Sequence, residues 1–90
     1  MAWISTFCDL VTDGDTFWTT EPHCIRLATV CTPDKGEAGF TKAKNTLERL
    51  ILNKSIRYEQ VGTSYNRIVA EVTVDGMSVN HYMRLEGYTC

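Results

Sequence analysis

Hydrophobic and polar residues alternate along the first third of the chain, as they do in half-buried β-strands. The first alternating segment has two expected faces, with Trp3, Phe7 and Val11 on one and Ile4, Cys8 and Leu10 on the other. A turn signal at residues 13–14 separates it from residues 15–20, which are rich in β-branched and aromatic side chains. Residues 24–30 form a third apolar segment, which ends before Thr32-Pro33. The pattern therefore predicts three strands.

The period changes from two to that of a helix after residue 35. Apolar side chains recur at helical spacing at Phe40, Ala43, Leu47, Leu50 and Ile51. This spacing predicts a helix that ends near residue 53. Two more strands are expected at residues 56–61 and 68–74, then a turn at 75–76 and a short helix over 79–86 capped at residue 87.

This order of elements predicts a mainly β (α+β) fold in a single domain spanning residues 1–90. Five strands in a meander, with one helix after the third strand, match a five-stranded OB-type barrel. The short helix at residues 79–86 would follow the last strand. The chain has 90 residues and no internal repeats or linkers, which suits one core and excludes a second.

Composition is that of a globular protein, with 43% hydrophobic and 22% charged residues. No apolar stretch approaches the roughly 20 residues that span a bilayer. Residues 1–6 lack the basic and apolar regions of a signal peptide. These observations predict a cytoplasmic protein with no membrane association, and no obligate protein partner is evident.

Charge is unevenly distributed, although the net charge is only −2. Residues 1–34 hold five acids and one base, residues 35–57 hold six bases and two acids, and residues 58–90 hold four acids and two bases. The small negative total argues against nucleic-acid binding through the overall field of the protein. A basic middle beside an acidic front would place phosphates next to a metal-binding edge, and a solvated helix face is the equally favoured alternative.

The four cysteines lie at Cys8, Cys24, Cys31 and Cys90 and contain no C-x-x-C pair. Two histidines do not complete a zinc pattern with them. Without a secretory signal, reduced thiols are the expectation, and a structural zinc or a disulfide is the less favoured alternative.

Six short motifs, in this order and at these spacings, resemble the staphylococcal nuclease (thermonuclease) family over roughly residues 9 to 88. They are Val-Thr-Asp-Gly-Asp-Thr at 11–16, Ile-Arg-Leu at 25–27, Thr-Pro-Asp at 32–34, Tyr-Asn-Arg at 65–67, Val-Asn at 79–80 and Glu-Gly-Tyr at 86–88. The resemblance implies an OB barrel and a metal-dependent nuclease that hydrolyses phosphodiester bonds of DNA, RNA or both. Ca²⁺ is the implied cofactor, with Mn²⁺ or another divalent ion as alternatives.

The resemblance also implies roles for individual residues. Asp15 matches a carboxylate ligand of calcium, and Thr32 matches a residue that offers the metal its backbone carbonyl. Arg26 and Arg67 match two arginines that hold the scissile phosphate, a role that suits the planar, permanently charged guanidinium. Asp34 stands where a glutamate orients or deprotonates the attacking water.

Two positions depart from the family pattern. Cys31 occupies the place of a second calcium-binding aspartate, and a thiol is a poor calcium ligand, so weakened calcium binding is expected. A small half-buried residue in a site that has drifted from the family pattern is the favoured interpretation of Cys31, and a softer metal there or a redox role for the cysteines is the alternative. Asp34 is one methylene shorter than glutamate, which moves its reach to the water. These departures favour, as the alternative function, a non-catalytic nucleic-acid- or protein-binding module on the same barrel.

The remaining candidates are substrate-binding residues. Tyr65 matches a tyrosine near the phosphate in the family. Lys42 and Lys44 would hold a nucleic-acid backbone, or else lie on a solvated helix face. The aromatic side chains of the first strands could stack bases, but such residues are more often core or barrel wall; they are Trp3, Phe7, Phe17 and Trp18.

Overall fold

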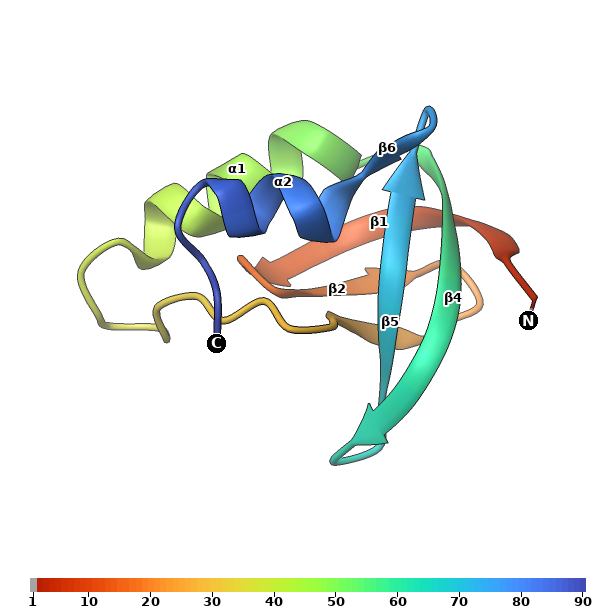
Figure 1. Cartoon of the computed structure of the whole chain (residues 1–90), viewed down its shortest axis with the longest axis horizontal. Helices are drawn as coiled ribbons and strands as arrows, with labels where there is room; N and C mark the ends of the chain where they lie inside the picture. Colours follow the sequence, from red (N-terminus) through yellow and green to blue (C-terminus); the bar gives the residue numbers. More distant parts are fainter. Residues whose placement is uncertain (1) are drawn as a thin grey trace.

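A six-stranded, curved sheet surrounds an apolar core, and two helices cover one side of it (Figure 1). The structure is a computed structural model that describes residues 2–90. Within those residues the elements are β1 (Ile4–Asp13), β2 (Thr16–Thr19), β3 (Cys24–Leu27), α1 (Phe40–Ile51), β4 (Ser55–Ser64), β5 (Arg67–Val74), β6 (Met77–Ser78) and α2 (Val79–Leu85). The mainly β prediction with two helices is confirmed.

The strands follow the order β3-β2-β1-β4-β5-β6, and each neighbouring pair in this order is antiparallel. β3 also pairs with β5, in parallel, with Ile25 opposite Ile68 and Arg26 opposite Val69. This pairing brings the first and fifth strands of the order side by side. Side chains of β3 and β5 that point to the same face therefore lie next to each other, although the two strands are far apart in the sequence.

The sixth strand was not predicted. Asp75 and Gly76 both have positive φ, 50° and 80°, as the two central residues of a tight hairpin turn require. Met77 and Ser78 then pair with Val74 and Thr73 before α2 begins.

Both helices lie close to their predicted positions. α1 buries Ala43, Leu47 and Ile51 on one face, as the helical spacing predicted. At the start of α2, the backbone N–H of His81 donates to the Ser78 hydroxyl. α2 is followed by Gly87, whose φ of 96° and whose N–H bond to the Arg84 carbonyl confirm the predicted cap. Within residues 2–90 neither helix is long and apolar enough to cross a membrane.

The predicted faces of the first strand were wrong. Cys8 and Val11 are both buried, whereas Ile4, Phe7 and Leu10 are exposed. The pairing of β1 with β2 shifts register between Cys8 and Leu10, and such a bulge reverses which side chains point inward beyond it.

The third strand is shorter than predicted and ends at Leu27 instead of residue 30. Thr29 has a φ of 57°, which turns the chain out of the extended conformation. Val30 returns to form a single bridge with Thr89 near the other end of the chain. The segment that follows β3 then packs against the β1–β2 turn, where Thr32 lies next to Gly14.

Candidate functional site

The Asp13-Gly14-Asp15 turn is held by its own side chain and by two neighbouring segments. The backbone N–H of Asp15 donates to Asp13 Oδ1 over 3.1 Å, which confirms Asp13 as a turn-former. A Cβ atom on Gly14 would lie 2.7 Å from the Ala43 Cβ and 2.8 Å from the Thr32 Cγ2. Glycine is therefore needed here for close approach, and the turn is pressed against α1 and the segment that contains Thr32.

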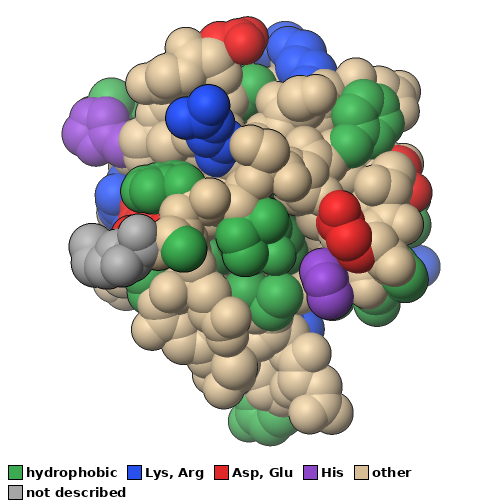
Figure 2. Space-filling model, turned by 90° about the vertical axis from the view of Figure 1, so that its right-hand side faces the viewer, with side chains coloured by type: hydrophobic (Ala, Val, Ile, Leu, Met, Phe, Trp, Pro, Cys, Tyr) green, Lys and Arg blue, Asp and Glu red, His purple; other side chains and the backbone are tan. Residues whose placement is uncertain are grey.

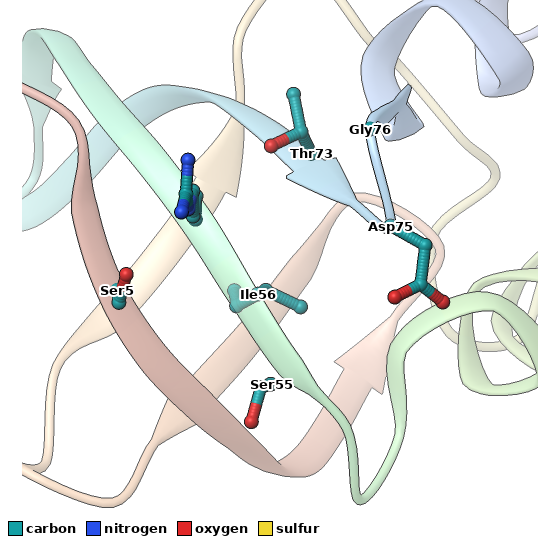
Figure 3. Close-up of a pocket in the computed structure, with 7 residues that line it drawn as sticks. Ser5, Ser55, Ile56, Thr73, Asp75 and Gly76 are labelled. Atoms are coloured by element: carbon teal, nitrogen blue, oxygen red, sulfur yellow. The ribbon is translucent and has the colours of Figure 1, made fainter.

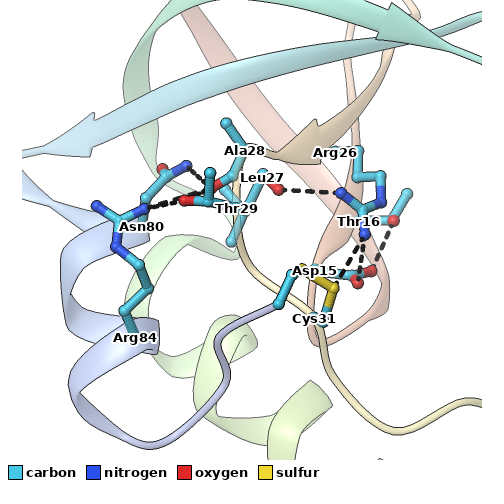
Figure 4. Close-up of a disulfide and its surroundings, with 10 residues drawn as sticks. Asp15, Thr16, Arg26, Leu27, Ala28, Thr29, Cys31, Asn80 and Arg84 are labelled. Carbon is cyan, nitrogen blue, oxygen red and sulfur yellow. Dashed lines mark hydrogen bonds and ion pairs between the residues drawn. A yellow bond between two sulfur atoms is a disulfide. The ribbon is translucent and has the colours of Figure 1, made fainter.

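An ion pair joins this turn to β3 (Figure 4). Arg26 Nη2 lies 3.6 Å from Asp15 Oδ2, and the two side chains are only 23% and 13% exposed. The Thr16 hydroxyl donates to Asp15 Oδ1 over 3.0 Å. Arg26 Nη1 also donates to the carbonyl of Leu27 over 3.4 Å. Both ends of the pair are thus fixed by additional hydrogen bonds.

The Asp15 carboxyl is unusually hard to ionise in this setting. Its pKa is raised from 3.8 to about 6, first by burial and then by the hydrogen bond and negative charge of Asp13. The Thr16 hydroxyl and the Arg26 guanidinium act in the opposite direction without outweighing them. The turn therefore holds two adjacent carboxyl groups whose negative charges are incompletely neutralised by Arg26.

Cys31 lies beside this ion pair, but as half of a disulfide with Cys90. The Arg26 Nη2 approaches its sulfur at 3.7 Å, and the backbone N–H of Cys31 donates to the Tyr88 carbonyl over 3.2 Å. The disulfide corrects the expectation of four reduced thiols. It also corrects the prediction of Cys31 as a metal ligand or soft-metal site, because a disulfide sulfur offers no thiolate.

The second arginine lies on the same side of the sheet as the first. Arg26 alternates with the fully buried Ile25 and Leu27, so it points to the outer face of β3. Ile25 pairs with Ile68, which places Arg67 opposite Cys24 on that outer face. The pKa of the Cys24 thiol agrees with this placement: burial raises it, the Arg67 charge lowers it and the Asp13 charge raises it.

The guanidinium of Arg67 makes fewer polar contacts with the protein than that of Arg26. Its Nε donates to the Ser64 carbonyl over 3.3 Å. Within residues 2–90, its two terminal nitrogens make no hydrogen bond or ion pair with protein atoms. Arg67 thus presents a free pair of donors on the surface that Arg26 and Asp15 share.

Four other predicted site residues, described next, make no side-chain hydrogen bond or ion pair with this cluster within residues 2–90. Asp34 is exposed, and only its backbone is bonded, through its N–H to Glu37 and its carbonyl to the N–H of the same residue. Tyr65 is 92% exposed at the tip of the β4–β5 hairpin, which in Figure 1 projects on the side opposite the helices. Lys42 and Lys44 flank Ala43 on α1.

Oxygen donors suited to a hard cation are present at the turn. Asp13 and Asp15 are adjacent, and the pKa of Asp15 is raised first by burial and then by the hydrogen bond and charge of Asp13, so a bound divalent cation would favour its ionised form. Thr32 lies against the same turn. No group of three carboxylate, imidazole or thiol side chains gathers anywhere in residues 2–90. A cation at this turn would therefore have to be held by two carboxylates together with backbone oxygen and water.

One buried asparagine, Asn80, holds together the elements that carry the site. It belongs to the Val-Asn motif of the sequence, to which no role was assigned. Asn80 is fully buried, and its Oδ1 accepts the Val72 N–H over 2.9 Å. Its Nδ2 donates to the carbonyls of Ala28 and Ala70, each over 3.0 Å. Asn80 thus ties α2 to β5 and to the end of β3, the two strands that carry the arginines (Figure 4). An asparagine at the start of an amphipathic helix was the available signal.

A pocket lies elsewhere on the molecule. A shallow cavity of about 500 Å³ opens between β1, β4 and the β5–β6 turn (Figure 3). Its lining consists of Ser5, Ser55, Ile56, Arg57, Thr73, Asp75 and Gly76. None of these is a predicted site residue. This cavity is separate from the Asp15–Arg26 cluster.

Comparison with protein-family models finds no match, and comparison with curated proteins finds no similar sequence.

Proposed function

We propose that the chain is a metal-dependent nuclease of the thermonuclease type, which hydrolyses phosphodiester bonds of DNA, RNA or both. The observation that carries the proposal is the placement of Arg26 and Arg67 on one outer face of the β3–β5 pair, with the Asp15 carboxylate 3.6 Å from Arg26. Two guanidinium groups beside a carboxylate pair suit a phosphate and a cation bound side by side.

In this proposal Arg26 and Arg67 have different tasks. Arg26 is held by Asp15 and by the Leu27 carbonyl, so its position is fixed before a phosphate arrives. The terminal nitrogens of Arg67 bond no protein atom in the described part of the chain and would be available to the phosphate oxygens. Both stay charged at any relevant pH, so both stabilise the negative charge that builds up as the phosphorus is attacked. Asp34 would take the proton of the attacking water.

Asp15 would hold a Ca²⁺ or Mn²⁺ ion, assisted by Asp13 and by the backbone carbonyl of Thr32. When bound, the cation supplies neutralisation of phosphate charge and orientation of water. The raised pKa of Asp15 supports this assignment, because a cation would favour the ionised form that the protein alone disfavours.

We extend the proposal to the fold and the location. The order of antiparallel pairs together with the parallel β3–β5 pair supports a five-stranded OB-type barrel formed by β1 to β5. A cytoplasmic location is proposed from the sequence alone, and the Cys31–Cys90 disulfide weighs against it because disulfides persist mainly in oxidising compartments.

The experiment is a cleavage assay on single-stranded DNA and RNA with Ca²⁺, Mn²⁺ or chelator. Wild-type protein should cleave only with metal, and Arg67→Ala should lose on the order of 100-fold in rate, as expected for removing a donor that stabilises transition-state charge. Arg57→Ala is the matched control, since Arg57 is exposed and lines the separate pocket. Asp34→Ala tests the proposed base.

A second candidate function is a nucleic-acid-binding module without catalysis. It is favoured by Asp34, whose carboxylate is exposed and makes no hydrogen bond or ion pair within residues 2–90, and by the oxidised state of Cys31. Wild-type protein that binds single strands but shows no metal-dependent cleavage above Arg67→Ala and Asp34→Ala would establish this candidate and reject the nuclease.

A further inference from the structure

Large apolar side chains remain exposed on this molecule, and Figure 2 shows hydrophobic groups gathered near the centre of one face. Leu10 and Trp18 are two of the exposed large apolar residues of the molecule, with exposures of 55% and 37%. Sequence analysis placed Trp18 with the aromatic residues expected in the core or barrel wall. Its neighbour Phe17 is indeed fully buried, whereas Trp18 points outward.

The strand register places Trp18 in a row that runs across four strands. Trp18 of β2 pairs with Leu10 of β1 on one side and with Cys24 of β3 on the other. The parallel pairing of Ile25 with Ile68 then places Arg67 of β5 next to Cys24. Paired residues point to the same face of a sheet, so the outer row is Leu10–Trp18–Cys24–Arg67.

A second row on that face carries Arg26, one of the candidate catalytic residues. Thr16 of β2 pairs with Asp13 of β1 and with Arg26 of β3. Thr16 and Trp18 are two residues apart on one strand, which separates the two rows by about 7 Å. A row of apolar surface thus runs parallel to a row that carries Asp13 and Arg26.

We infer that Trp18 is a base-stacking platform for a single-stranded nucleic acid whose phosphates lie on Arg26 and Arg67. The aromatic face of tryptophan stacks any nucleobase, and guanidinium groups in the adjacent positions match the backbone of the same strand. A paired duplex does not fit this role, because its bases are stacked on one another and are not free to lie on a side chain. The inference rests on the proposed function for the position of the phosphates.

The charge of Arg67 at the end of the row favours an anionic occupant over a neutral protein surface. The apolar row ends in Arg67, whose terminal nitrogens are free within residues 2–90, and Arg26 lies one row away. A polyanion with exposed aromatic bases satisfies both features together. Neutral apolar partners would leave the Arg67 guanidinium without a counter-charge at the edge of the contact.

The test measures binding of a labelled single-stranded oligonucleotide in chelator, so that no cleavage occurs. Trp18→Ala should raise Kd about tenfold, in line with the loss of one stacked base, and Trp18→Phe should recover most of the affinity. Trp3→Ala is the matched control, because Trp3 is also exposed but precedes β1, about seven residues before Leu10 along the chain. An oligonucleotide made only of abasic sites should bind wild type and Trp18→Ala equally.

The outcomes separate this inference from the nuclease proposal. If wild type binds but does not cleave in metal, and Trp18→Ala still weakens binding, the platform stands and the nuclease proposal fails. Equal Kd for wild type and Trp18→Ala overturns the platform whether or not cleavage is seen. A change in oligomeric state on Trp18→Ala without a change in Kd also overturns it, and assigns the row to self-association.

Discussion

Replacing Asp15 with asparagine should make the protein more stable at neutral pH while removing its proposed metal-dependent activity. The Asp15 carboxyl is mostly buried, and burial is the largest cause of its raised pKa. The charge of Asp13 adds to the effect, and the attraction of Arg26 does not cancel it. Asparagine removes the charge and keeps an oxygen that can accept the Thr16 hydroxyl.

The magnitude follows from the pKa and its sign from proton linkage. A carboxyl that titrates at 3.8 when unfolded and at about 6 when folded binds more protons in the folded state between those values. The Asp15 carboxyl therefore contributes fully to the free energy of unfolding below about pH 4, and this contribution is lost as the pH rises through about 6. At 1.36 kcal/mol per pKa unit, the ionised form costs the fold about 3 kcal/mol above that pH.

The assay is urea unfolding of wild type and Asp15→Asn at pH 4 and pH 8, with chelator present. The two proteins should have similar stability at pH 4, and the variant should be more stable at pH 8 by up to about 3 kcal/mol. Asp9→Asn, at an exposed position of β1, is the control for removing a surface carboxylate. Ca²⁺ should stabilise wild type and leave Asp15→Asn unchanged.

One result would refute the reasoning. If Asp15→Asn is less stable than wild type at pH 8 in chelator, the attraction between Asp15 and Arg26 outweighs burial and repulsion from Asp13. The turn would then be a satisfied ion pair, and the surplus negative charge that supports a cation site would not exist.

Three further changes test the frame around the site, each by urea unfolding. Asn80→Leu removes three buried hydrogen bonds and should cost about 3 kcal/mol; a loss below 1 kcal/mol would mean that the bonds contribute little. Gly14→Ala places a Cβ 2.7 Å from the Ala43 Cβ and 2.8 Å from the Thr32 Cγ2, so the turn must shift, and the free energy of unfolding should fall by about 1–3 kcal/mol. Ca²⁺ binding should be lost in this variant, and unchanged binding would contradict the packing argument. Cys90→Ser opens a loop closed across 59 positions and should cost up to about 4 kcal/mol, as should reducing wild type; insensitivity to reductant would contradict this.

The positions of the regular elements could be predicted because their periodicity reflects one-sided burial. The helical spacing of Ala43, Leu47 and Ile51 exists because these side chains share one buried face. The prediction of the buried face was wrong for the first strand because its alternation is interrupted. A bulge between Cys8 and Leu10 shifts the alternation without leaving a recognisable mark in the sequence. Apolar residues on both faces then make the inward side ambiguous.

Asp15 and Arg26 were candidates because of the motif resemblance and not because of strand pairing, although the strands that carry them are adjacent in the chain. The contact between Asp15 and Arg26 follows from β2 and β3 forming a hairpin. The link between β3 and β5 and the disulfide are different, since both join segments far apart in sequence. Cysteine spacing alone does not define a pairing, so Cys31 and Cys90 carried no signal of their proximity.

The disulfide changes how a metal would have to be held. Oxidised Cys31 contributes no charge beside Arg26, so the negative charge of the site comes from Asp13 and Asp15, both on one turn. The separation of two carboxylates on a single turn depends on the shape of that turn, which Gly14 fixes by packing against Ala43 and Thr32. Cation affinity and the packing of α1 against the turn are therefore expected to rise and fall together, a coupling that a site with ligands on separate strands would not have.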